Sequence, residues 1–132
     1  MGTDWEKDAQ TPEEYHSVGC TRGREFILRL TTGADPFLGI QKFAIDHEIM
    51  FAKIHATFMG GLQPAKYLKW IPDYKNPDNW HREGVAVNTN LSMILSMSGI
   101  IHPLTDDSGK EVPFPAMHFV AGGAWDTATF GG

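Results

Sequence analysis

The sequence predicts a single α+β domain in which one main helix packs on a mainly antiparallel mixed sheet. Three observations carry this prediction. The chain has 132 residues, which is enough for one hydrophobic core and too few for two. Residues 36–48 place apolar side chains at helical spacing, whereas six or so other segments alternate or form short apolar runs. Glycine, proline and polar residues separate these segments.

The first predicted strand covers residues 24–30. Its apolar residues Phe26, Leu28 and Leu30 occupy every second position. A period of two is typical of a strand with one buried face.

The main helix is predicted to run from about residue 36 to residue 48. Asp35 supplies an N-cap oxygen, and Pro36 takes the first helical position, where its missing N–H has no cost. An apolar stripe follows at spacings of three and four residues, formed by Phe37, Ile40, Ala44 and His47.

Five further strands are predicted, over residues 50–58, 65–71, 82–88, 91–101 and 116–121. Residues 59–61 predict a sharp bend because they contain two adjacent glycines, and residues 104–112 predict a polar hairpin turn. The run from Met93 to Ile101 is apolar on both faces, which predicts a central strand covered on both sides. Three serines at positions 92, 96 and 98 indicate a polar face on this strand.

Charge is distributed unevenly along the chain. Residues 1–18 carry a net charge of −4, residues 19–82 carry +3 and residues 83–132 carry −4. We therefore expect residues 1–20 to form an acidic, partly mobile arm and residues 21–132 to form the domain. The overall charge disfavours DNA binding, which needs clustered cations, but the middle segment can still present a basic face.

Location follows from what the sequence lacks. No apolar run reaches the roughly 18 to 20 residues of a membrane helix, and the acidic N-terminus is unlike a secretory signal. Cys20 is the single cysteine, so it cannot form an internal disulfide, and nothing around it marks a nucleophile. We predict a cytoplasmic protein without a membrane partner.

Four stretches, in their order and spacing, resemble the PPC ("plants and prokaryotes conserved") domain from about Arg22 to the end of the chain. They are GREFILRL at 23–30, FMGGL at 58–62, LSMSGII at 95–101 and MHF at 117–119. The resemblance implies a mixed sheet with one helix and assembly as a trimer. It also implies DNA binding, since in plants the domain follows an AT-hook in nuclear DNA-binding proteins and the standalone bacterial form is described as DNA-binding. The fold is similar to that of acetolactate decarboxylase-type enzymes, which hold zinc with histidines.

The sequence departs from this family pattern in three places. An AT-hook core is Arg-Gly-Arg-Pro, whereas here Arg22-Gly23-Arg24 is followed by Glu25. Family members often carry His-x-His on a late strand, and here Ala116 takes the first position while His118 keeps the second. The family continues beyond its Gly-Gly pair with two more strands, whereas this sequence stops at Gly131-Gly132. We therefore expect C-terminal strands to be missing and sheet edges to be exposed.

Three of the six histidines are candidate zinc ligands, namely His118, His55 and His102. His118 matches the family position, and the other two lie at or near strand ends. Imidazole nitrogen is a good zinc ligand, and a catalytic zinc site typically has three protein ligands. No short His-x-His spacing occurs, so three merely packed histidines are the alternative. Zinc is the one cofactor that the sequence suggests, and no catalytic residue is predicted.

Basic and aromatic residues interleave in the middle of the chain. The basic residues Lys66, Lys69, Lys75 and Arg82 are the candidate DNA contacts, because cations beside aromatic rings can hold a nucleic-acid strand. The same composition suits a trimer interface, and we favour this role for the tryptophans. The candidate ligand or interface residues are Gly60, Gly61, Trp70, Trp80 and Trp125.

The functional prediction is a trimeric DNA-binding protein of the standalone PPC type, without an intact AT-hook and with little sequence preference. The alternative is a metal-dependent enzyme or small-ligand-binding protein with a histidine site at a subunit interface. A basic face on the assembly favours the first, and convergence of the three candidate histidines favours the second.

Overall fold

The computed structural model describes residues 16–56, 60–72, 75–76, 80–125 and 129–132. This part contains the helix α2 (Pro36–Asp46) and only antiparallel strand pairs, so the predicted α+β class is confirmed. The strands are β1 (Ala52–Ala56), β2 (Gly61–Leu62), β3 (Ala65–Pro72), β4 (Trp80–Asn88), β5 (Ser92–Thr105), β6 (Glu111–Gly123) and β7 (Thr129–Gly131).

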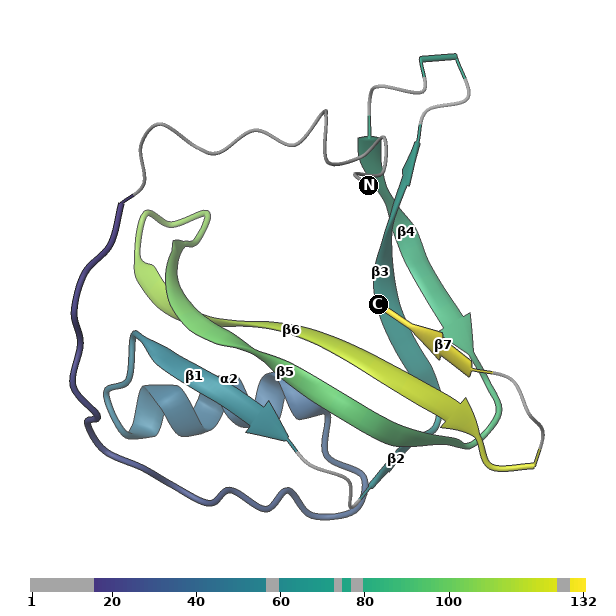
Figure 1. The fold of residues 1–132 in the computed structure, drawn as a ribbon, viewed down its shortest axis with the longest axis horizontal. Helices are drawn as coiled ribbons and strands as arrows, with labels where there is room; N and C mark the ends of the chain where they lie inside the picture. The colour runs from purple at the N-terminus through teal and green to yellow at the C-terminus, as the bar shows by residue number, and fades with distance from the viewer. Residues whose placement is uncertain (1–15, 57–59, 73–74, 77–79, 126–128) are drawn as a thin grey trace, which may run out of the picture.

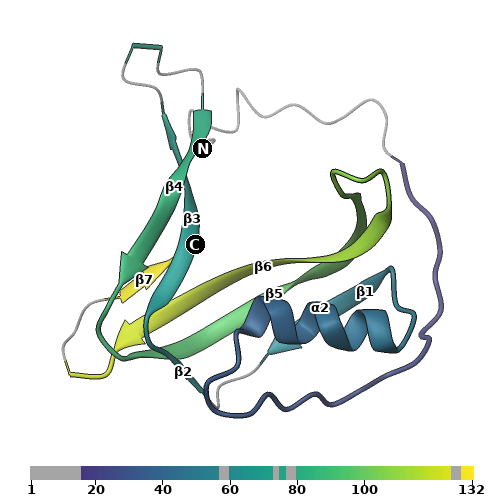
Figure 2. The same cartoon turned by 180° about the vertical axis from the view of Figure 1, so that it is seen from behind.

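The strands form two separate sheets. The main sheet has the order β1-β5-β6-β7, with β2 also paired to β5, while β3 and β4 pair only with each other. Helix α2 lies against one face of the main sheet, and the β3–β4 ribbon rises from one end of it (Figures 1 and 2). The architecture is therefore one helix-covered sheet with a two-stranded projection.

A β-bulge in β5 changes which residues share a face of the main sheet. Register shifts between Ile94 and Ser96, so that Ile94 pairs with Ala121 but Ser96 pairs with Val120. Ser92 is buried, whereas Ser96 is exposed. The prediction of a common polar face for the three serines is therefore wrong for Ser92.

The core of the described part is small. The buried hydrophobic residues are Ala44, Ala65, Met97, Ile101 and Ala121. Gly99 lies among them on β5, where an added Cβ would sit 2.0 Å from the carbonyl oxygen of Ala116. Only glycine therefore allows β5 and β6 to approach this closely.

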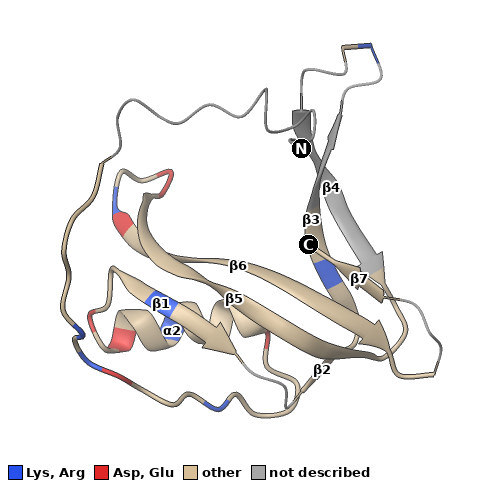
Figure 3. Cartoon of the chain, in the orientation of Figure 1, with Lys and Arg blue, Asp and Glu red and all other residues tan. Residues whose placement is uncertain are grey.

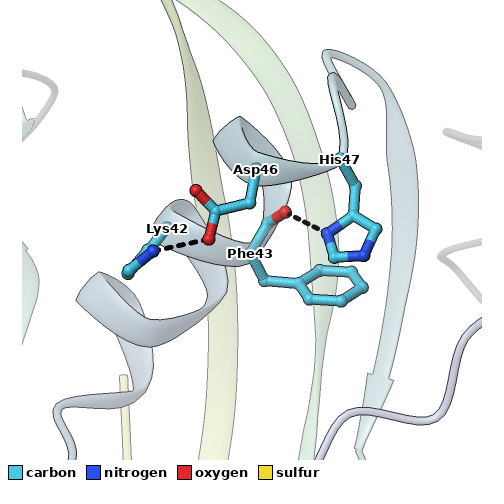
Figure 4. Close-up of polar contacts among 4 residues, drawn as sticks. All are labelled: Lys42, Phe43, Asp46 and His47. Carbon is cyan, nitrogen blue, oxygen red and sulfur yellow. Dashed lines mark hydrogen bonds and ion pairs between the residues drawn. The ribbon is translucent and has the colours of Figure 1, made fainter.

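The capping signals of the predicted helix are confirmed, although the helix ends two residues earlier than predicted. Leu38 N–H donates to Asp35 Oδ1 at 3.0 Å, with Pro36 in the first turn. At the other end, His47 stacks on Phe43 and places Nδ1 2.9 Å from the Phe43 carbonyl oxygen, beside the Lys42–Asp46 ion pair (Figure 4). Glu48 has φ of 54°, so the helical backbone cannot continue through it.

The predicted strand at residues 24–30 is wrong. No backbone hydrogen bond joins it to another described residue, and it passes alongside α2 as irregular chain (Figure 1). Its alternation does place Phe26 against the helix, with ring centroids 5.1 Å from Phe43. The alternation therefore marks a side chain that contacts the helix, but the segment has no neighbouring strand among the described residues.

The remaining strand predictions hold with changed limits. β5 is central as predicted, but it is covered on one face only, since Ile100 and Leu104 are 49% and 44% exposed. β5 and β6 run further than predicted and shorten the turn to residues 106–110, and β7 was not predicted.

Residues 57–59 and most of the predicted N-terminal arm lie outside the described residues. No helix within the described ranges is long and apolar enough to cross a membrane.

The turn between β5 and β6 is organised by the carboxylate of Asp106. Its Oδ1 accepts hydrogen bonds from Ser108 N, Ser108 Oγ and Lys110 N at 2.9, 2.6 and 2.9 Å. Gly109 completes the turn with φ of 85°. The hydrogen bond from the Ser108 side chain, followed by that from the Lys110 backbone, lowers the pKa of Asp106 below its ordinary value of 3.8.

This turn predicts a difference between the wild type and Asp106→Asn at acid pH. Because the pKa of Asp106 is lower in the folded state than in the unfolded state, its ionised carboxylate stabilises the fold at pH values above the ordinary pKa. This stabilisation is lost as the pH falls through the folded-state pKa. Between about pH 6 and about pH 3, the urea midpoint of the wild type should therefore fall further than that of Asp106→Asn, which cannot titrate. Equal decreases in the urea midpoint of the two proteins would show that the turn does not favour the ionised form of Asp106.

Candidate functional site

Two of the candidate zinc ligands lie in one row across the main sheet. His55 on β1 pairs with Ser98 on β5, and Ser98 pairs with His118 on β6. Residues directly opposite each other in an antiparallel pair point to the same face. Both imidazoles therefore share one face, about 10 Å apart at their Cα atoms, with Ser98 between them.

A shallow open pocket lies at this row. It is lined by Ser96, Ser98, His118, Phe119 and Val120 and has a volume of about 160 Å³. That volume is below the roughly 300 Å³ at which ordinary small-molecule pockets begin. One chain therefore offers a polar recess for a few heavy atoms.

The third candidate ligand, His102, is not part of this row. It lies on β5 four residues beyond Ser98, about 13 Å along the strand. Its Nδ1 is 3.0 Å from the Pro103 carbonyl oxygen, and its ring centroid is 5.5 Å from that of Phe114. Among the described residues no three His, Cys, Asp or Glu side chains are grouped to hold a metal ion. A single chain therefore does not assemble the three predicted ligands.

The four candidate DNA contacts all lie on the β3–β4 hairpin. Lys66 and Lys69 are on β3, Arg82 is on β4, and Lys75 is in the connection between the strands. The Lys66 and Lys75 side chains are exposed and lie towards opposite ends of the ribbon (Figure 3). Acidic residues of the described part lie instead around α2 and on the β5–β6 hairpin (Figure 3).

Aromatic packing fixes the base of the ribbon to the main sheet. Tyr67 on β3 meets Phe119 on β6 edge-on at 5.3 Å and stacks on Phe130 of β7 at 5.6 Å. Sequence reasoning missed this role because nothing in the sequence pairs Tyr67 with two residues more than fifty positions away. The one signal in the sequence for a role of Tyr67 was its position between the candidate lysines Lys66 and Lys69.

The candidate ligand or interface residues lie on different elements. Trp70 and Trp80 are on the ribbon, at positions opposite Arg82 and Pro72 respectively. Trp125 follows β6 and is 87% exposed. Gly60 and Gly61 join β2 to β5, since Ile94 N donates to the Gly60 carbonyl and Gly61 pairs with Met93.

The arginines of the incomplete AT-hook are engaged within the chain. Arg22 pairs with Glu25 at 3.1 Å. Arg24 donates to the His47 carbonyl at 3.1 Å and lies over the Phe26 ring. That this tripeptide is not a minor-groove hook stays a prediction.

A comparison with protein-family models matches residues 18–132 to the Plants and Prokaryotes Conserved (PCC) domain. This is the family that the sequence resembles under the abbreviation PPC, and the match spans well over half of the chain. Comparisons with curated proteins and with solved structures gave no match.

The aromatic contacts of Tyr67 predict that Tyr67→Ala loosens the ribbon selectively. Each aromatic pair is worth about 0.5–1.5 kcal/mol, so amide exchange in β3 and β4 should accelerate severalfold while exchange in β5 and β6 changes little. Tyr67→Phe keeps the ring, so exchange in β3 and β4 should accelerate less than in Tyr67→Ala. Exchange measured by mass spectrometry that is unchanged in Tyr67→Ala would contradict this anchoring.

Proposed function

Because the chain belongs to the Plants and Prokaryotes Conserved (PCC) domain family, we propose that it is a DNA-binding protein that acts as a homotrimer with little sequence preference. One observation carries the DNA-binding part of this proposal: the separate β3–β4 ribbon bears all four candidate cations. A two-stranded antiparallel ribbon fits the major groove of B-DNA.

The spacing of the described lysines suits contact with the phosphate backbone. Lys66 lies near the start of β3, and Lys75 lies beyond its end at Pro72, which is about 20 Å along the strand from Lys66. Contacts to phosphates position a protein on DNA without reading its sequence. Residues 65–88 contain four Lys or Arg and three Asp or Glu residues, so binding by one ribbon is weak and needs several copies in one assembly.

Replacing both described lysines should weaken DNA binding and its dependence on salt. Each phosphate contact contributes roughly 0.9 to the slope of log affinity against log salt. Lys66→Gln/Lys75→Gln should therefore reduce the slope by about 1.8 per chain engaged, measured by fluorescence anisotropy with duplexes of unrelated sequence.

The matched control is Lys110→Gln, because Lys110 is an exposed lysine in the turn between β5 and β6, outside the ribbon and outside the strands of the main sheet. It should bind like the wild type on every duplex. The DNA-binding proposal fails if the wild type does not bind at low salt, or if Lys110→Gln and the double variant lose affinity equally.

The face of the main sheet that carries Ser98 and His118 supports the trimer. By register, Ile100 and Val120 share this face with Ser98 and His118, and both are more than two-fifths exposed. A small core leaves a chain of this size marginally stable by itself. Burying this apolar face between subunits removes the exposed side chains from water.

The same face favours a second candidate function, a histidine site completed at the subunit interface. His55 and His118 supply two imidazoles, and a neighbouring copy seated on this face would bring further ligands to the pocket. Two imidazoles of one chain do not suffice for a closed zinc site. A zinc ion held between copies would act as a Lewis acid on a small carbonyl or carboxylate compound.

Trimer and histidine site can be tested together. Ile100→Asp should divide the mass of the assembly by three, measured by light scattering, and leave the far-UV circular dichroism unchanged because the side chain is half exposed. Added zinc should raise the Tm of the wild type but not that of His118→Ala or Ile100→Asp. The zinc effect should weaken at acid pH, because protons compete with the metal for the imidazole nitrogens.

His16→Ala is the control, since His16 is an exposed histidine outside the main sheet. An unchanged mass in Ile100→Asp would refute assembly through this face. A wild type that gains no stability from zinc would refute the histidine site and leave the DNA-binding proposal standing.

A further inference from the structure

Five polar side chains gather on one face of the main sheet. The row of His55, Ser98 and His118 places a short hydroxyl side chain between two imidazoles. Lys53 lies two residues before His55 on β1, and Ser96 lies two residues before Ser98 on β5, so both share this face. We call these five residues the donor cluster, because their ammonium, imidazole and hydroxyl groups all donate hydrogen bonds.

The donor cluster has a low centre and a high rim. Ser98 is short, whereas His55 and His118 stand on the two neighbouring strands, each about 5 Å away at the Cβ atoms. Lys53 is diagonal to Ser98, about 7 to 8 Å away, a distance that its long side chain can span. The recess lined by Ser96, Ser98 and His118 therefore lies within reach of every donor of the cluster.

The strands that carry the donor cluster have no carboxylate near it. β1 and β5 contain no acidic residue, and β6 contains only Glu111, at its first position. Glu111 pairs with Thr105, seven residues along β5 from Ser98. Figure 3 shows the same distribution, with acidic residues of these strands and their turn confined to the end of the β5–β6 hairpin. A chain with a net charge of −5 thus has a local surface that attracts anions.

A tetrahedral oxyanion suits these donors better than a carboxylate does. A carboxylate offers two oxygens, whereas a phosphate monoester offers three strong acceptor oxygens and a charge of about −1.5 to −2 at neutral pH. Hydroxyls and imidazole N–H groups donate to such oxygens whether or not the imidazoles are charged. The ammonium of Lys53 adds a charge-assisted hydrogen bond, which is stronger than a neutral one.

We propose that the donor cluster binds a phosphate group, either free or at the end of a small ester, without a metal ion. Ser98 donates to the phosphate from below, His55 and His118 donate from the two sides, and Lys53 neutralises part of the charge. The recess has a volume of about 160 Å³ and is open, so it holds the phosphate and leaves the rest of an ester outside.

The phosphate site shares two histidines with the second candidate function but needs neither zinc nor a second copy of the chain. It depends on the side chains of three strands whose pairing gives their register, and not on a free edge of the sheet. It is also separate from the candidate DNA contacts, which lie on the β3–β4 ribbon.

An NMR titration of the whole chain with inorganic phosphate, at constant neutral pH and with a chelator present, tests the proposal. The ring signals of His55 and His118 should shift saturably with a Kd on the order of 1 mM, as expected for a small anion at an open site. The signals of His16 and His47 should not shift. Sodium chloride at equal ionic strength is the reference and should shift none of them.

Methyl phosphate distinguishes the two sources of the phosphate group. Tighter binding of this monoester than of inorganic phosphate would identify an ester as the ligand. Equal or weaker binding, with the same two histidine signals shifted, would identify free phosphate. Both results support the site.

Three variants separate the donor cluster from a general effect of charge. Lys53→Gln should raise the Kd for phosphate about threefold, the size of an exposed charge contact. Ser98→Asp places a carboxylate at the centre and should raise the Kd about tenfold or more by repulsion. Lys110→Gln is the matched control, since Lys110 is an exposed lysine in the β5–β6 turn, and it should keep the wild-type Kd.

The Ser98→Asp variant also separates this proposal from the zinc site. A carboxylate is a zinc ligand, so this variant should keep or strengthen zinc binding where it loses phosphate. The phosphate proposal is overturned if phosphate shifts His55 and His118 no more than chloride does, if Lys53→Gln and Lys110→Gln have equal Kd values, or if Ser98→Asp binds phosphate normally. A wild type that binds phosphate but gains no stability from zinc would count against the zinc site alone.

Discussion

The pairing of β5 with β6 is the constraint on which the rest of the structure depends. These two strands share the longest register in the described chain, from Ser92–Gly123 to Thr105–Glu111. Every other strand of the main sheet attaches to one of them, and α2 covers the face that they form. Gly99 permits the close approach at the middle of the pair, and the Asp106 turn closes its end. Changes elsewhere can remove one element, whereas a change in this register would displace all of them.

The sequence predicted elements whose signals are local. Asp35 and Pro36 mark the start of α2 because capping involves neighbours within one turn. The strand at 24–30 failed for the opposite reason: alternation reveals that one face is apolar, but pairing depends on a distant or external partner. The row of His55, Ser98 and His118 was equally out of reach, because it depends on two registers that a single sequence does not encode locally. His102 was grouped with these residues by type, and distance along β5 separates it.

The exposed apolar side chains indicate that this domain makes further contacts with other molecules. Among the described residues the buried hydrophobic side chains are few and mostly small, while the side chains of Ile27, Ile100 and Trp125 are exposed to solvent. Exposed apolar residues of this kind are tolerated singly but mark interaction surfaces when they adjoin polar groups. The sheet face proposed as the trimer contact joins the apolar Ile100 and Val120 to His118. Assembly and ligand recognition would therefore depend on the same surface.

The bulge at Leu95 also bears on how the chain length of this domain can vary. Ile94 faces the side of the buried Ala121, Ser96 faces the opposite side, and Leu95 is the additional residue between them. Deleting Leu95 would join Ile94 to Ser96 in ordinary alternation and would leave Ser98 next to His118. Deletion at any regular position of β5 would instead invert the faces of all residues beyond it. Leu95 is thus the point in this strand at which the loss of one residue can be inherited without rearranging the sheet.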